Sequence, residues 1–203
     1  MNAPADIRVC FVGDSLTAGF GDPEHLGWAG RVSASAAKNG FGLTTYNLGI
    51  RLETSADIAG RWLEECARRL PRACQPHVVF SFGVNDTTEE AGKTRVAAQD
   101  SVSNLNAILG SAKTRYKVLM IGPAPVADTD QNRRIDALSR QFDATCRKLE
   151  VPYLPVFEAL HASVVWMKQA GENDGAHPRA KGYAEFARLV IGWNHWWFRS
   201  AAA

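Results

Sequence analysis

The sequence has no large excess of charge of either sign and no long apolar run. Its 203 residues hold 23 lysines and arginines against 21 aspartates and glutamates, a formal net charge of +2. This balance argues against nucleic acid or an anionic membrane as the partner. Residues 1–6 contain no basic segment, and the apolar run that follows is shorter than a signal-peptide core or a membrane span. We therefore expect a cytoplasmic protein with no stable membrane insertion.

Cysteine is scarce, and the sequence offers no metal-ligand motif built on it. The four cysteines form no Cys-x-x-Cys pair, and the five histidines form no His-x-x-x-His pair. Small buried thiols are expected rather than disulfides, because cytosolic thiols stay reduced. We therefore predict neither a metal ion nor another cofactor. The cysteines are Cys10, Cys66, Cys74 and Cys146.

The chain also lacks linkers, repeats and low-complexity tracts. A hydrophobic content of 46% with 22% charged residues is typical of a globular protein with a packed core. We therefore expect one domain over residues 1–203.

Short β-like runs alternate with helix-like segments along the whole chain. This alternation is typical of a parallel sheet covered by helices on both faces. We expect an α/β fold, a three-layer α/β/α sandwich of flavodoxin-like type with a five-stranded parallel sheet. The predicted strands are 7–12, 43–48, 77–82, 117–121 and 152–156. Apolar residues at three-to-four spacing predict helices at 28–38, 58–70, 102–109, 135–149 and 179–197.

Small or hydrogen-bonding residues follow the predicted strands. Asp14 and Ser15 come directly after the first strand, Gly49 ends the second, and Asn85 follows the third. The segment 174–178 precedes the last predicted helix. Because parallel strands end at one edge of an open sheet, these segments are expected to meet there. Ligands bind at such an edge.

These four segments resemble the four blocks of the GDSL-type, or SGNH, hydrolases, a family of serine esterases and lipases. The resemblance spans residues 13 to 178 with the blocks in order, and it implies the SGNH hydrolase fold and an ester-hydrolysing enzyme. The matching residues are Ser15 in Gly13-Asp14-Ser15-Leu16, Gly49 in Asn47-Leu48-Gly49, Asn85 in Gly83-Val84-Asn85-Asp86, and Asp174 with His177 in Asp-x-x-His-Pro.

The chemistry of ester hydrolysis needs these residue types. A serine hydroxyl becomes a nucleophile when a neighbouring base accepts its proton, so Ser15 is the candidate nucleophile and His177 the candidate base. Asp174 would orient the imidazole and stabilise its charged form. The resemblance implies that the backbone N–H groups of Ser15 and Gly49 and the side-chain amide of Asn85 form an oxyanion hole. The expected substrate is a small acyl ester, and thioesters, lysophospholipids and acetylated sugars stay open.

Two other functions stay open at this point. An acyltransferase would use the same site and pass the acyl group to an alcohol. A flavodoxin-like module would bind FMN or phosphate through the run 15–19, although this explains neither Asn85 nor His177.

Two further segments carry expectations about packing. Leu52 stands where many family members have a second glycine, and we expect its side chain to point outward. The aromatic-rich run 193–198 is expected to pack against the domain, with a homo-oligomer interface as the next reading.

Overall fold

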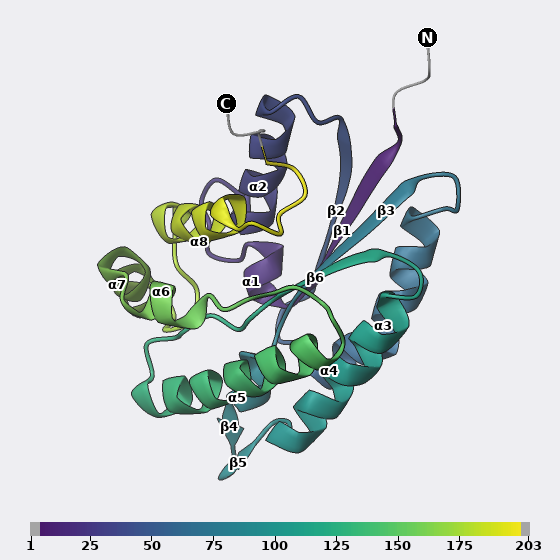
Figure 1. Cartoon of the computed structure of the whole chain (residues 1–203). Helices are drawn as coiled ribbons and strands as arrows, with labels where there is room; N and C mark the ends of the chain where they lie inside the picture. Colours follow the sequence, from purple (N-terminus) through teal and green to yellow (C-terminus); the bar gives the residue numbers. More distant parts are fainter. Residues whose placement is uncertain (1–4, 200–203) are drawn as a thin grey trace.

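A five-stranded parallel sheet forms the middle of the structure, and helices cover both of its faces (Figure 1). The computed structural model describes residues 5–199, so both ends of the predicted domain 1–203 lie outside the described residues. The strand order is β2-β1-β3-β6-β7, the flavodoxin-like order, and it confirms the expected fold class. The strands are β1 (Ile7–Gly13), β2 (Leu43–Gly49), β3 (Gln75–Ser81), β6 (Lys117–Ile121) and β7 (Tyr153–Leu154).

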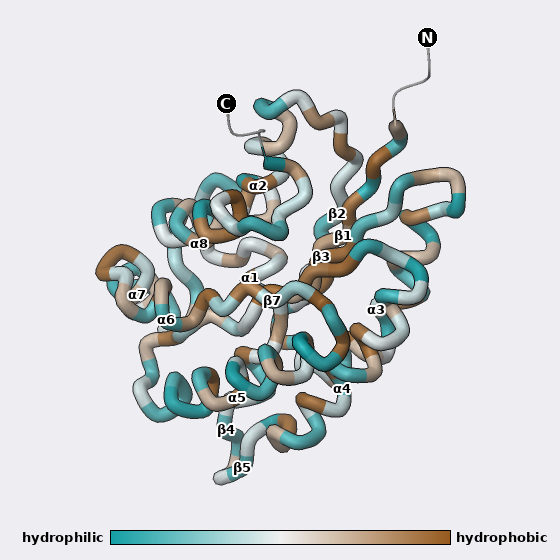
Figure 2. Tube along the Cα trace, viewed as in Figure 1, coloured by the Kyte–Doolittle hydropathy of each residue, from teal (hydrophilic) through white to brown (hydrophobic). Residues whose placement is uncertain are grey.

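Alternate residues of each strand face opposite layers of helices. In β1, Val9 and Phe11 belong to the core shared with α2, α7 and α8, whereas Cys10 and Val12 belong to the core shared with α3, α4 and α5. The strands therefore form the most hydrophobic part of the trace (Figure 2). The helices are α1 (Ser15–Ala18), α2 (Gly27–Lys38), α3 (Ser55–Arg69), α4 (Ala98–Ala112), α5 (Thr129–Lys148), α6 (Phe157–His161), α7 (Val164–Glu172) and α8 (Ala180–Gly192).

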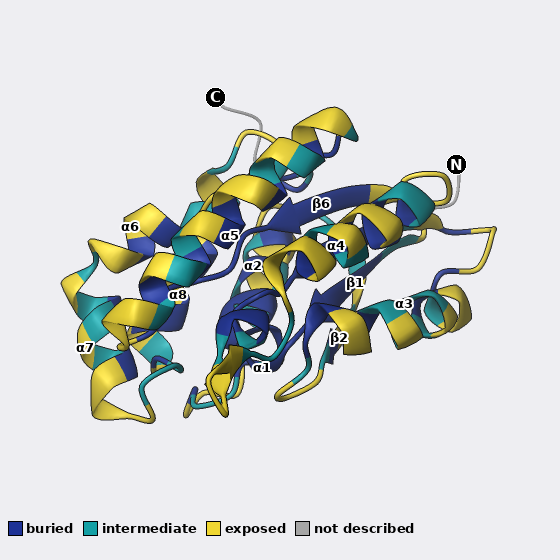
Figure 3. Cartoon of the chain, turned by 90° about the horizontal axis from the view of Figure 1, so that it is seen from below, coloured by how far each residue is buried: buried dark blue, intermediate teal, exposed yellow. Residues whose placement is uncertain are grey.

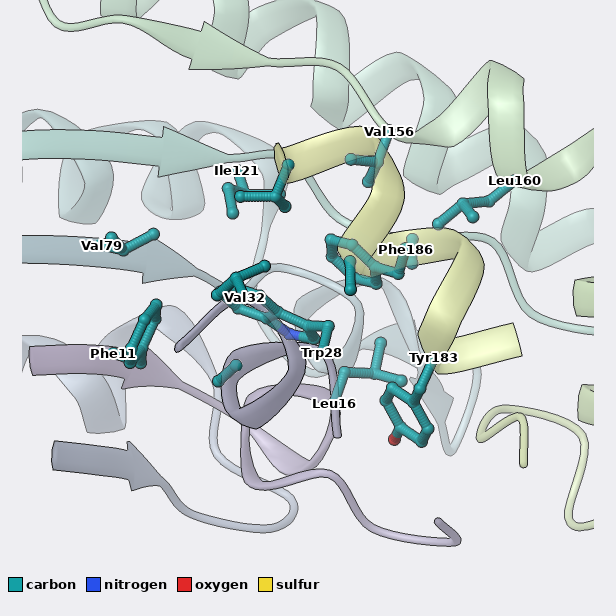
Figure 4. Packing of buried hydrophobic residues seen from close by; sticks show 14 of the residues in the cluster. Phe11, Leu16, Trp28, Val32, Val79, Ile121, Val156, Leu160, Tyr183 and Phe186 are labelled. Atoms are coloured by element: carbon teal, nitrogen blue, oxygen red, sulfur yellow. The ribbon is translucent and has the colours of Figure 1, made fainter. Parts of the chain in front are cut away.

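Large aromatic side chains fill the first of these cores. Phe11, Val79 and Ile121, from three adjacent strands, face α2 and α8 (Figure 4). The rings of Trp28 and Phe186 are stacked with centroids 5.2 Å apart, which joins α2 to α8 above the sheet. The outer sides of the helices are exposed, while α1 is buried (Figure 3).

All five predicted strands of the sheet are present, and the long helices lie where the apolar spacing placed them. Three features were not predicted: the short helices α1, α6 and α7, the 3-10 helix η1 (Asn85–Thr87), and a hairpin of β4 (Glu89–Glu90) with β5 (Lys93–Thr94). Apart from α7, which has nine residues, these segments hold two to five residues and carry too few positions for a periodicity to be recognised. The extra turns of helix therefore emerge only in the folded chain.

The last helix ends at Gly192, so the prediction that it continues to residue 197 is wrong. The chain becomes extended at Trp193 and folds back over the sheet. Trp196 and Phe198 are each 3% exposed, and Trp196 lies against Phe11. Burial of these rings outweighs continued helix after a glycine, which is a weak helix former. The expectation that the aromatic end packs against the domain is confirmed.

The four cysteines are buried and free, as expected. Between residues 5 and 199, no helix combines the length and the apolar character that crossing a membrane requires.

Candidate active site

The carboxyl end of β1 carries Ser15 to the edge of the sheet. Gly13, the last residue of β1, lies in register with Gly49 of β2 and Ser81 of β3, so the three strands end together. Ser15 is the first residue of α1, and its side chain lies in a largely buried position with 5% of the residue exposed. The fold therefore brings the serine to the edge at which ligands bind in open α/β sheets.

Ser15, His177 and Asp174 form a continuous chain of hydrogen bonds. The distance from Ser15 Oγ to His177 Nε2 is 2.6 Å, and that from His177 Nδ1 to Asp174 Oδ2 is 2.7 Å. The serine is separated from the histidine by 162 positions in the sequence. Tertiary structure therefore joins three side chains that sequence reasoning had linked only by resemblance and chemical need.

Asp174 sets which ring nitrogen of His177 carries the proton. A carboxylate accepts hydrogen bonds, so Nδ1 of His177 is assigned as the donor and Nε2 is left with a lone pair. The Ser15 hydroxyl can then donate to Nε2. This arrangement is the one required for a histidine that removes the proton of a serine.

Backbone groups prevent Asp174 from turning away. Its Oδ1 accepts hydrogen bonds from the N–H groups of Ala176 (3.0 Å) and His177 (2.9 Å). Burial alone would raise the pKa of Asp174, but the N–H groups of His177 and Ala176 and the His177 ring together hold it below its usual value. The carboxylate therefore stays charged beside the imidazole.

The loop that carries His177 is tied to its surroundings on both sides. The side-chain amide of Asn173 donates to the His177 carbonyl at 3.1 Å, and the Phe20 ring meets the His177 ring edge to face at 4.9 Å. Tyr183 of α8 donates to the Phe20 carbonyl at 2.7 Å. These contacts restrict the imidazole to one orientation.

Asn85 lies at the same edge, in η1 after β3. One of its two amide N–H groups donates to the Glu53 carbonyl at 2.8 Å, which orients the side chain. The second N–H is available to a ligand, because an Asn amide nitrogen carries two hydrogens. The N–H of Ser15 is also unused by α1 itself, since the first N–H groups of a helix have no partner within it.

Gly49 lies at this edge as expected, but its N–H is already engaged. It donates to Oδ1 of Asn47 at 3.0 Å. The lack of a side chain at Gly49 has another use, because a Cβ there would lie 2.2 Å from the backbone nitrogen of Ala18 and 2.7 Å from its Cα. Gly49 therefore allows α1 to approach the end of β2 closely.

Asp86 braces the loop that holds Asn85. It is completely buried and accepts hydrogen bonds from the N–H and hydroxyl of Ser55 and from the hydroxyl of Ser101 at 2.8 Å. Ser55 begins α3 and Ser101 lies in α4. The carboxylate thus joins the loop after β3 to two helices.

Sequence reasoning missed Arg61, which holds the strand ends together. Its Nη2 donates to the carbonyls of Gly13 (3.1 Å) and Leu48 (3.0 Å), and its Nε donates to the Glu53 carboxylate at 2.6 Å. The Glu53 carbonyl in turn accepts from Asn85. No sequence signal marks this arginine, since its spacing is that of any helical residue.

Leu52 adopts a left-handed backbone conformation, with φ of 67°, in the loop between β2 and α3. Its side chain points outward and the residue is 65% exposed, as expected. A glycine adopts this conformation without strain, which explains why that residue type suits the position.

Asp14 braces the start of α1 but leaves one oxygen without a partner. Oδ1 accepts from the Leu16 N–H at 3.0 Å, while Oδ2 is buried and has no partner among the described residues. Burial raises the pKa of Asp14 to about 7; the Leu16 N–H opposes this shift and the charge of Asp86 adds to it.

Asp14→Asn is expected to stabilise the protein relative to wild type more at pH 8 than at pH 5. The folded state holds the Asp14 proton up to about pH 7, whereas the unfolded chain releases it near the ordinary value of 3.8, so ionisation opposes folding as the pH rises between them. The added gain should be about 1–3 kcal/mol. Urea unfolding of both proteins at the two pH values measures it, and a gain independent of pH would contradict it.

In the stretch from residue 5 to residue 199, no three His, Cys, Asp or Glu side chains are grouped so that they could hold a metal ion.

The sequence is similar to a known protein family and to an esterase. The sequence profile of the GDSL-like Lipase/Acylhydrolase family matches residues 11–185. The chain is similar to the esterase TesA of Pseudomonas aeruginosa, with 29% identity over 168 residues that cover 82% of this chain and 77% of the relative. Residues 11–185, which the family profile matches, contain all four blocks of the site.

Solved structures share the fold at low sequence identity. A lipase/acylhydrolase from Enterococcus faecalis superimposes with a TM-score of 0.72 and 21% identity, covering 91% of this chain and 93% of its own. A catalytic mutant of Axe2, an acetylxylan esterase from Geobacillus stearothermophilus, gives a TM-score of 0.80 and 18% identity with complete coverage of both chains. At such identities the likeness establishes the architecture.

Proposed function

The chain belongs to the GDSL-like lipase/acylhydrolase family and is a carboxylic ester hydrolase, and we propose that it works through an acyl-enzyme on Ser15. The observation that carries the proposal is the pair of short hydrogen bonds from Ser15 to His177 (2.6 Å) and from His177 to Asp174 (2.7 Å). The match to this family also favours an ester hydrolase over the flavodoxin-like alternative.

In the proposed first half-reaction, Ser15 Oγ attacks the acyl carbon while its proton passes to His177 Nε2. The C–O bond to the leaving alcohol then breaks, and His177 returns the proton to the alcohol oxygen. In the second half-reaction, a water molecule loses a proton to His177 and attacks the acyl carbon. The bond between that carbon and Ser15 Oγ then breaks, the acid leaves, and His177 returns the proton to Ser15 Oγ. Asp174 keeps the imidazole oriented and compensates its positive charge throughout.

The proposed oxyanion donors are the Ser15 N–H and the free amide N–H of Asn85. Fixed donors aimed at the developing negative charge lower the barrier, because they need no rearrangement when the charge forms. Gly49 supports them by letting α1, and with it the Ser15 N–H, lie close to the end of β2. The N–H of Gly49 would have to leave Asn47 before it could contribute directly.

The acyl-enzyme is tested by covalent trapping. The protein is treated with a fluorophosphonate, digested, and the labelled peptide is identified by mass spectrometry. We expect one phosphonyl group on Ser15, because a serine activated by His177 displaces fluoride from phosphorus. Labelling of another serine, or none while ester hydrolysis continues, would contradict the proposed nucleophile.

Asn85→Ala is expected to lower kcat by about 10²- to 10³-fold, the usual loss for one oxyanion donor. The effect should fall mainly on kcat, because the donor acts on charge that exists only in the transition state. Steady-state hydrolysis of p-nitrophenyl butyrate measures it. Asn106→Ala, on the exposed side of α4, is the matched control and should behave as wild type. A rise in KM with unchanged kcat would instead assign Asn85 to ground-state binding.

A further inference from the structure

A cleft of about 450 Å³ adjoins the proposed active site on the side of His177. It lies between the loop that follows α1 and Arg179, the residue directly before α8. Its lining also includes Phe20, His25 and Arg51. Phe20 also contacts the His177 ring, and Arg179 follows His177 by two positions. The cleft therefore lies next to the proposed base, with the Phe20 ring between them.

Arg51 is held over the cleft without losing its hydrogen-bond donors. Its guanidinium carbon lies 3.5 Å from the centroid of the Phe20 ring, so the cation is stacked on the aromatic face. The five N–H groups of a guanidinium lie in its plane and stay available to an oxyanion. A single aromatic ring thus separates this fixed positive charge from His177.

Neither Arg51 nor Arg179 has a carboxylate partner. Among residues 5–199, no Asp or Glu oxygen lies within 4.0 Å of either guanidinium, although most other described arginines form such pairs. Their charges are therefore available to a ligand rather than consumed within the fold.

Two acidic groups near the cleft, Asp22 and Glu24, share the cation of Arg31. Asp22 also lines the cleft, but its side chain is fully buried, pairs with Arg31 and accepts from the Gly27 N–H at 2.8 Å. Glu24 pairs with the same arginine at 2.7 Å. Arg31 compensates one of these two negative charges, and Asp22, the carboxylate that lines the cleft, has a fully buried side chain. The groups that the cleft presents to solvent therefore include the cations Arg51 and Arg179.

We infer that this cleft binds an anionic group, a carboxylate or a phosphate, on the leaving-group side of the ester substrate. The inference rests on the proposed function, because it uses the role of His177 as the group that protonates the leaving alcohol. We place the alcohol portion in this cleft because Phe20, which lines it, contacts the ring of the base. Arg51 and Arg179 would each donate charge-assisted hydrogen bonds to its oxyanion.

The inference is tested with two acetyl esters that differ in charge, 4-acetoxybenzoate and its methyl ester. In Arg51→Gln the ratio of kcat/KM for the anionic ester to that for the neutral ester should fall by about 10-fold, and further when Arg179→Gln is added. Arg72→Gln is the matched control, since Arg72 lies in another cavity, at the opposite edge of the sheet, and also has no carboxylate partner among residues 5–199. The control should leave the ratio at its wild-type value.

Several outcomes would overturn the inference without touching the proposed function. Equal losses for the two esters in Arg51→Gln would show that the arginine only supports Phe20 and His177, and an unchanged ratio would show that the cleft does not sense charge. If the wild-type protein cleaves neither ester, the proposed function fails instead. Calorimetric binding of 4-hydroxybenzoate to wild type and Arg51→Gln then decides the subsite alone, with weaker binding by the variant expected and equal binding contradicting it.

The same assay separates the two sources of the anion. Inorganic phosphate is added as an inhibitor of methyl 4-acetoxybenzoate hydrolysis. Competition that is lost in Arg51→Gln extends the subsite to phosphate, and competition that persists in the variant places phosphate elsewhere and restricts the subsite to carboxylates.

Discussion

Ser15→Ala is expected to lower kcat for p-nitrophenyl acetate by about 10⁴- to 10⁶-fold. The substitution removes the only oxygen hydrogen-bonded to His177 Nε2 among the described residues, and alanine offers no atom that can form an acyl-enzyme. What survives should be the contribution of the oxyanion donors and of substrate binding, which do not depend on the hydroxyl.

The fold should tolerate this change for two reasons. The hydrogen bond that is lost joins Ser15 to another residue of the site, His177, and alanine is smaller than serine and fits the same space. Urea unfolding with a midpoint close to that of wild type would establish this. Ser103→Ala is the matched control: Ser103 is exposed on α4, where its hydroxyl donates to the Gln99 carbonyl at 2.9 Å. Equal rates in wild type and Ser15→Ala would refute the proposed mechanism.

Asp174→Asn is expected to lower kcat by about 10⁴-fold through the tautomer of His177. Oδ1 accepts two backbone hydrogen bonds, from Ala176 and His177, and only the oxygen of an asparagine can replace it there. The amide nitrogen must then face Nδ1 of His177. Since that nitrogen donates, Nδ1 becomes the acceptor, the ring proton moves to Nε2, and the proton of Ser15 has no acceptor.

The tautomer gives this prediction a readout that a loss of folding would not produce. Nitrogen-15 NMR of the His177 ring should show a protonated Nδ1 in wild type and a protonated Nε2 in Asp174→Asn. Asp143→Asn removes a carboxylate of the same size from α5, where it pairs with Arg147, and should change neither the rate nor the tautomer. An active Asp174→Asn protein with the wild-type tautomer would remove Asp174 from the mechanism.

The sheet and its long helices were predictable because their signals are local. Strands β1, β3 and β6 carry apolar runs, and each long helix repeats apolar residues on one face, so these patterns can be recognised without knowing the contacts. The end of α8 was not predictable, because the burial of Trp196 against Phe11 of β1 is a contact across almost the whole chain. The helix stops where that tertiary contact becomes more favourable.

The candidate site divides in the same way. Ser15, Asn85, Asp174 and His177 were identified because their residue types and order resemble the four blocks of the GDSL-type hydrolases, and because ester hydrolysis needs a nucleophile, a base and hydrogen-bond donors. The hydrogen bond from the Gly49 N–H to Asn47 was not predicted, because it depends on the conformation of one strand end. Arg61 carries no local signal for the same reason, as its partners lie in other elements.

By itself, the sequence determined the α/β class, the number of strands in the main sheet, and the residue types that ester hydrolysis requires. Only the tertiary structure decided that Ser15 lies 2.6 Å from His177, and that Arg51 is stacked on the Phe20 ring beside it. The physical reason is the separation along the sequence of the residues that interact. Strand and helix patterns arise between residues that are neighbours in the chain. A hydrogen bond or a cation over a ring depends on distances between atoms that only packing brings together.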